Sequence, residues 1–237
     1  MENIPSDLII IISGSSGIGK STIARQLLKE SPDSFIIEEW DLIRESIRTN
    51  NSHIFKNISQ MFRGQIEKID MELENILHCR LLNFSTTELT VNEILEQSQI
   101  FISPLISICH RIQSKGLCAI IEGVNLPIRF LLSQPGTSKY FLNSKNIVLV
   151  NLYATNYELY KERLNTRAKQ RKCSPVSNEH FENIINYNKY NSELSVDTFV
   201  QKNKLENKVI NIDVTSSKFS SAIEITKYIF KIVNNIN

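Results

Sequence analysis

The residues best suited to chemistry form one continuous run near the start of the chain, Gly14-Ser15-Ser16-Gly17-Ile18-Gly19-Lys20-Ser21-Thr22. This run fits the pattern G-x-x-x-x-G-K-[ST], in which glycines let backbone N–H groups turn inward around phosphate oxygens. Lys20 would reach the β and γ phosphates of a nucleotide, and the Ser21 hydroxyl would bind Mg²⁺. The alternative interpretation is a glycine-rich turn with an exposed lysine, which could have the same sequence. The run, however, follows an apolar strand pattern and opens a helical one, and this context favours phosphate binding.

A carboxylate, Glu122, ends another apolar run, Leu117 to Ile121. Ligands of parallel sheets bind at the carboxyl ends of strands, so an acid in this place is suited to hold Mg²⁺ through a water and to line the substrate site. A strand-end carboxylate without any metal role is the alternative. We predict Ser21 and Glu122 as the metal-binding pair.

Asp41 and Arg44 lie just past a third apolar run. Asp41 is suited to cap the helix that follows, and also to bind an acceptor hydroxyl near the γ phosphate or to take its proton. Arg44 lies one turn later and would either clamp an anionic substrate or remain a solvated charge. The lone tryptophan, Trp40, either stacks on a ligand or, as we expect, packs as a buried anchor.

Three arginines, Arg163, Arg167 and Arg171, recur every four residues in a helical pattern. Such a charged stripe is either a solvated face or part of a lid that closes over the phosphates and neutralises transition-state charge. Glu162 is the only acid between residues 160 and 172, which favours a lid at about 156–175. We predict catalytic roles for Arg163 and Arg167, beside Lys20 and Asp41.

Short apolar runs that alternate with helical patterns indicate parallel βαβ units in one doubly wound α/β sheet. The expected strands are Leu8–Ile12, Phe35–Ile37, Leu117–Ile121, Asn146–Val150 and Val209–Ile212. Residues 133–143, which contain Pro135-Gly136, are expected to form a turn-rich loop. We find no repeat or linker and predict a single domain, 1–237, whose helical segments at about 50–115 form an insertion.

Composition narrows the class of protein. The 237 residues carry a formal net charge of only +2, which does not favour binding to nucleic acid or to a membrane surface. The N-terminus lacks the charged and apolar regions of a signal peptide, and the longest apolar runs are far shorter than the roughly 20 residues of a membrane helix. The cysteines Cys79, Cys109, Cys118 and Cys173 are scattered along the chain, and we expect all four to be reduced thiols. We expect a cytoplasmic protein.

These segments together resemble the 2-phosphoglycerate kinase-like group of P-loop kinases. The resemblance rests on four stretches, which are Gly14–Ala24, Asp41–Glu45, Ile120–Val124 with Pro127, and the arginine helix. It implies a three-layer P-loop kinase fold with a five-stranded parallel sheet, helices on both faces, a helical substrate-binding insertion and an arginine-bearing lid. It also implies ATP and Mg²⁺ as cosubstrates, transfer to a hydroxyl of a small anionic metabolite, and a homodimer as a possible assembly. Trp40 and Asn125 depart from the Thr and His that we associate with the group.

Other reactions on the same framework stay open. A kinase that acts on a nucleoside, a sugar or a polynucleotide 5′ end would share this skeleton, and so would a nucleotide-dependent switch. A GTPase would need Asn-Lys-x-Asp, whereas residues 203–206 read Asn-Lys-Leu-Glu. A motor would carry Asp-Glu where this chain has Glu122-Gly123. A small-molecule kinase is therefore the leading hypothesis.

Overall fold

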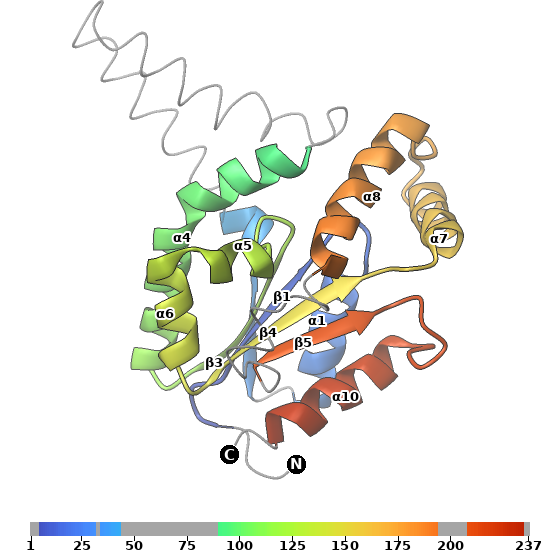
Figure 1. The fold of residues 1–237 in the computed structure, drawn as a ribbon. Coiled ribbons are helices and arrows are strands. Elements are labelled where there is room, and N and C mark those ends of the chain that lie inside the picture. The colour runs from blue at the N-terminus through green and yellow to red at the C-terminus, as the bar shows by residue number, and fades with distance from the viewer. Residues whose placement is uncertain (1–4, 32–33, 44–89, 194–207, 235–237) are drawn as a thin grey trace, which may run out of the picture.

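The computed structural model describes residues 5–31, 34–43, 90–193 and 208–234. Its strands are β1 (Ile9–Gly14), β2 (Phe35–Glu39), β3 (Cys118–Gly123), β4 (Ile147–Tyr153) and β5 (Val209–Asp213). Its helices are α1 (Lys20–Glu30), α4 (Val91–Ser114), α5 (Ile128–Ser133), α6 (Pro135–Asn143), α7 (Tyr157–Gln170), α8 (Asn178–Ser192) and α10 (Ala222–Asn234). Figure 1 shows their arrangement around one sheet.

All five strands pair in parallel, in the order β2-β3-β1-β4-β5. This confirms the predicted five-stranded parallel sheet. The central strand β1 is buried along its whole length, as expected for a strand with neighbours on both edges and helices on both faces. Its pairing with β3 sets Ile12 beside Glu122, so both strands end at the same edge of the sheet.

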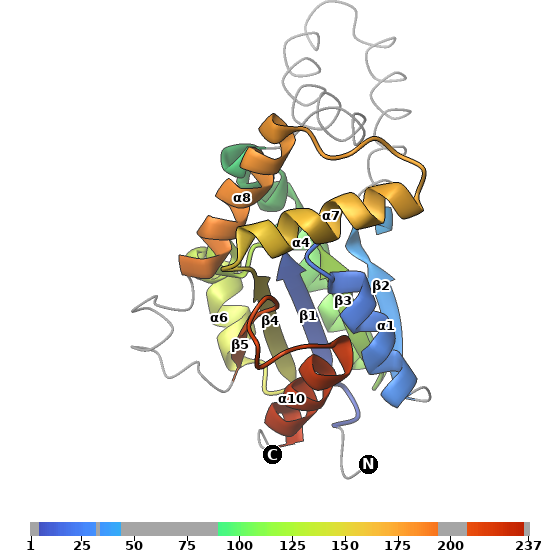
Figure 2. The ribbon, with the colours of Figure 1, turned by 90° about the vertical axis from the view of Figure 1, so that its right-hand side faces the viewer.

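Helices cover both faces of the sheet, which gives the three layers that the resemblance implied. Side chains alternate along β1, so that Ile10 and Ile12 join the core under α1 and α10, and Ile9 and Ile11 join the core under α4, α5 and α6. Helices α7 and α8 lie over the carboxyl ends of the strands (Figure 2). Within the described ranges, every helix is too short or too polar to cross a bilayer.

The expectation of a loop at residues 133–143 is wrong, because Pro135–Asn143 is helix α6. Pro135 occupies the first turn, where its fixed φ suits the helix. Proline lacks an N–H group, but an N–H in the first turn has no acceptor within the helix, so no hydrogen bond is lost. The hydrophobic side chain that anchors α6 is Phe141, which is buried against the sheet. The proline-glycine pair therefore marks a helix start.

Only the last part of the predicted insertion lies within the described residues. That part, Val91–Ser114, is α4, which begins with a capping box formed by Thr90 and Glu93. Phe101, Leu105 and Cys109 of α4 are buried against the sheet. This part of the chain is therefore packed into the core, and the bounds of the insertion stay a prediction.

Trp40 packs against the end of β3. It is fully buried, and its ring meets Phe101 of α4 edge-on, with 6.0 Å between ring centroids. A Cβ built on Gly123 would lie 2.6 Å from the Trp40 Cβ, so only glycine allows this approach. The contact holds the residue that follows, Asp41, next to the end of β3.

We predict that Gly123→Ala destabilises the fold, because the added methyl group has no room beside the buried Trp40 side chain. The expected loss is about 1–3 kcal/mol in the free energy of unfolding, measured by urea denaturation. Gly136→Ala in α6 is the matched control, because its Cβ would meet no heavy atom within 4 Å. The control should leave stability unchanged or raise it by up to about 1 kcal/mol. Equal midpoints for both variants would contradict the packing argument.

Candidate active site

The glycine-rich run connects β1 directly to α1, as the motif predicted. Gly14 is the last residue of β1, and Gly19 is the N-cap residue of α1. No side chain accepts a hydrogen bond from the first turn of α1 at the N-cap, and that turn holds no acid. Its N–H groups and the positive end of the helix dipole are therefore suited to bind an anion from outside the chain.

Lys20 lies inside this loop. Its side chain is only 7% exposed, and its ammonium donates a hydrogen bond to the Ser15 carbonyl over 3.1 Å. Burial lowers the pKa of Lys20 below its ordinary value, whereas the nearby carboxylates of Asp41 and Glu122 act in the opposite direction. A phosphate in the loop would offset the cost of burying this charge, since it would pair with the ammonium directly.

The two predicted metal ligands touch each other. The Ser21 hydroxyl donates a 2.5 Å hydrogen bond to Oε1 of Glu122, which is buried at the end of β3. A hydroxyl and a carboxylate are hard oxygen donors, which suit Mg²⁺. In the described part of the chain, no three His, Cys, Asp or Glu side chains gather as a metal cluster. Phosphate oxygens and waters would complete the coordination, as is usual for Mg²⁺.

Asp41 lies at the same edge of the sheet. The helix after β2 already includes residue 40, so Asp41 belongs to its first turn and is not the N-cap that one interpretation suggested. The side chain is half-buried, and its charge acts on Lys20. The charges of Asp41, just after β2, and of Glu122, at the end of β3, thus act on the same ammonium. Arg44 lies outside the described residues.

The predicted arginine stripe does not face the loop as a unit. Arg163 donates a 3.0 Å hydrogen bond to the carbonyl of Val214, which follows β5. Arg167 lies at the loop, since its Nη1 is 3.6 Å from where a Cβ on Gly17 would be. The reason is helix geometry, because residues four apart are rotated by about 40° and the stripe drifts around α7. Only Arg167 of the three is placed at the phosphate-binding loop.

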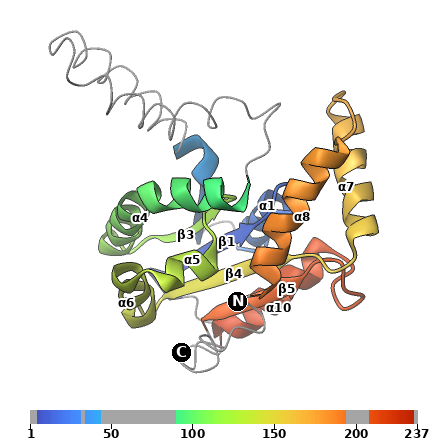
Figure 3. The same cartoon turned by 45° about the horizontal axis from the view of Figure 1, so that its top comes forward.

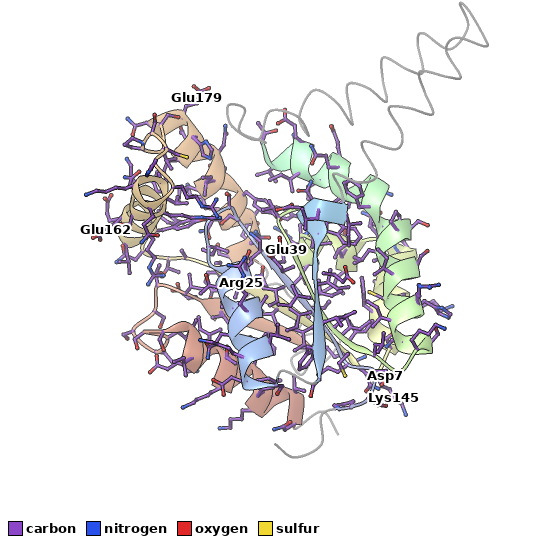
Figure 4. All side chains as sticks on the ribbon, turned by 180° about the vertical axis from the view of Figure 1, so that it is seen from behind. Asp7, Arg25, Glu39, Lys145, Glu162 and Glu179 are labelled. Atoms are coloured by element: carbon purple, nitrogen blue, oxygen red, sulfur yellow. The ribbon has the colours of Figure 1, made fainter. Side chains whose placement is uncertain are left out.

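Electrostatics supports this position of Arg167. Burial lowers the pKa of its guanidinium, and so does the charge of Arg171, whereas Glu122 acts in the opposite direction. The guanidinium of Arg167 is therefore close enough to interact electrostatically with Glu122, the carboxylate that contacts Ser21. Glu162, which belongs to the same helix, is exposed on its outer side and points away from the sheet (Figure 4).

Several buried polar residues near this edge were not predicted as part of the site. Tyr160 of α7 contacts the loop, and Tyr187 of α8 donates a 2.6 Å hydrogen bond to the carbonyl of Val124. Asn125 donates a hydrogen bond to Gln97 of α4, and both side chains are buried. The sequence did carry one signal, because Tyr160 and Arg167 are seven residues apart and share a face of α7. The Asn125–Gln97 pair, by contrast, could not be found from sequence spacing, because the two residues are 28 positions apart.

Helices α4, α7 and α8 enclose this edge of the sheet from different sides (Figure 3). The loop, Glu122 and Arg167 of α7 meet at the carboxyl ends of β1 and β3, where doubly wound sheets bind ligands. A phosphate-binding loop after β1 and the strand order β2-β3-β1-β4-β5 together define the P-loop kinase fold.

No protein-family model matches the chain. A 2-phosphoglycerate kinase of Methanococcus vannielii is 26% identical over 211 residues, which are 88% of this chain and 60% of the relative. The chain therefore spans 60% of the length of the curated relative that it matches.

Two solved structures are similar over nearly the whole chain. Shikimate kinase from Acinetobacter baumannii in complex with shikimate is 13% identical, covers 98% of this chain and 95% of its own, and has a TM-score of 0.44. A gluconokinase from Sinorhizobium meliloti is 11% identical, covers 98% of this chain and 97% of its own, and has a TM-score of 0.47. The chain has the P-loop kinase fold, and its similarity to a 2-phosphoglycerate kinase confirms the resemblance that its motifs indicated.

Proposed function

We propose that this chain is an ATP-dependent kinase that transfers the γ phosphate to a hydroxyl of a small anionic metabolite, similar to 2-phosphoglycerate. The observation that carries the proposal is the contact of Ser21 with Glu122 beside the buried Lys20, at the mouth of the glycine-rich loop. The name of the curated relative, 2-phosphoglycerate kinase, supports the same reaction.

Each chemical requirement of phosphoryl transfer has a candidate residue. The loop N–H groups and Lys20 would bind the phosphates, and Ser21 with Glu122 would hold Mg²⁺. When bound, Mg·ATP would supply the phosphoryl group and the metal would neutralise part of its charge. Asp41 would orient the acceptor hydroxyl and, as general base, take its proton. Arg167 would neutralise charge that develops in the transition state.

The side of the site beyond β3 is where we place the acceptor. Gln97 and Asn125 contribute buried, uncharged amides there, and Tyr187 binds the neighbouring backbone. Arg44 remains our predicted partner for an anionic group of the acceptor. A catalytic role for Arg163, a homodimer and a cytoplasmic location also stay predictions.

A screen of acceptors tests the proposed function directly. ADP release would be measured with Mg·ATP and phosphoglycerates, sugars, nucleosides or 5′-hydroxyl oligonucleotides, each with the wild-type chain and with Lys20→Ala. We expect stimulation by one class of small anionic alcohol and no stimulation in the variant. Stimulation by oligonucleotides alone would replace the acceptor class, and turnover that no acceptor changes would favour a switch.

Glu122→Gln keeps the shape of the side chain but removes its negative charge. We expect at least a tenfold higher Mg²⁺ requirement and a kcat lower by roughly 10²-fold, since the metal loses a charged partner. The matched control is Glu39→Gln, because Glu39 is the pairing partner of Glu122 at the end of β2 and instead lies 3.8 Å from Arg25 (Figure 4). Magnesium titrations of the transfer rate compare the two. Equal effects would remove Glu122 from the metal site.

Arg167→Ala should lower kcat by roughly 10²- to 10³-fold with a smaller change in ATP affinity, because its charge acts mainly on the transition state. Arg171→Ala, at the C-cap position just after α7, is the matched control and should retain nearly full turnover. Arg163→Ala tests the remaining prediction for the stripe. A fall in kcat without a lower melting temperature would support a catalytic role for Arg163. A lower melting temperature alone would indicate a structural role through its hydrogen bond to Val214.

A further inference from the structure

Tyr160 links α7 to the phosphate-binding loop by two hydrogen bonds. The side chain is 1% exposed, and its hydroxyl lies 2.5 Å from the carbonyl oxygen of Ser16 and 2.8 Å from the hydroxyl of Ser15. A carbonyl only accepts, so the single tyrosine hydrogen is donated to Ser16. The Ser15 hydroxyl must then donate to Tyr160. The Ser15 side chain is thereby turned toward α7, and only its backbone remains to bind an anion.

The bond to Ser16 sets the direction of the next N–H group. The peptide between Ser16 and Gly17 is trans and planar, so its C=O and N–H point in opposite directions. With the carbonyl held against α7, the Gly17 N–H must point away from α7. Gly17 has a φ of +72°, a conformation that glycine enters and leaves easily, so this peptide needs an external restraint.

The same helix face also determines where Arg167 lies. Tyr160, Leu164 and Arg167 are spaced i, i+4 and i+7, which places them on one side of α7. Leu164 fills the space in which Gly17 would carry a Cβ, so helix and loop are in direct contact. The Tyr160 ring also meets the ring of Phe181 in α8, with 6.3 Å between centroids. The ring therefore has packing partners that do not depend on its hydroxyl.

We propose that Tyr160 is a positioning residue whose hydroxyl orients the Ser16–Gly17 peptide for phosphate binding and holds α7, with Arg167, at the loop. This inference rests on the proposed function, because it takes a nucleotide polyphosphate as the ligand of the loop. The inner face of α7, which belongs to the predicted lid, is in direct contact with the loop through Tyr160 and Leu164.

The test is Tyr160→Phe, which removes the hydroxyl and keeps the ring. Tyr157→Phe is the matched control, because Tyr157 lies on the same helix and packs against the core, and the described part of the chain shows no hydrogen bond from its hydroxyl. Binding of Mg·ADP and of a non-hydrolysable Mg·ATP analogue would be measured by calorimetry. We expect about tenfold weaker binding in Tyr160→Phe, from the loss of two hydrogen bonds, and wild-type binding in the control.

A second measurement needs no nucleotide. Hydrogen–deuterium exchange of the free protein should become faster in peptides that cover residues 14–19 of Tyr160→Phe and stay unchanged in β4 and α10. In transfer assays the KM for ATP should rise and the KM for the acceptor should not. Unchanged affinity and exchange would overturn the proposal, and so would faster exchange throughout the chain with a lower melting temperature. A wild-type chain that binds no nucleotide would refute the proposed function, while loop exchange would still test the tyrosine.

Discussion

The in-register pairing of β1 with β3 is the constraint on which the site depends. Both strands run in the same direction, so the loop that follows β1 and the acid that ends β3 emerge at one edge. Ser21, in the first turn of α1, can reach Glu122 only because Ile12 and Glu122 are paired. A slip of one residue would turn Glu122 to the opposite face of the sheet and separate the two oxygen donors.

Charged groups are concentrated at this edge of the sheet. The Lys20 ammonium is buried, and the charges of Asp41, Glu122 and Arg167 all act on it. In the phosphoryl transfer that we propose, such preorganised charges would act strongly on the transition state because they need not rearrange during the reaction. Tyr160 and Leu164 of α7 contact the loop, and the same helix carries Arg167. One wall of the site is therefore part of the core.

The sequence predicted those features that depend on local pattern. The five strands were visible as β-branched runs, the loop as a complete motif, and Glu122 as the acid at a strand end. Helix α6 was missed because Pro135-Gly136 is a turn signal unless the proline occupies a first helical turn. Its helical state depends on burial of Phe141 against the sheet, and that burial is a tertiary contact.

By itself, the sequence determined the phosphate-binding loop, the alternation of strands with helices and the side-chain types available for a metal and for proton transfer. Those properties follow from residue type and short spacing. The tertiary structure alone decided that Arg167 lies at the loop while Arg163 binds Val214, and that Tyr160 bonds to Ser16 from 144 positions away. A helical period predicts which residues share a face, but the packing of α7 over the sheet determines which of them lies at the loop.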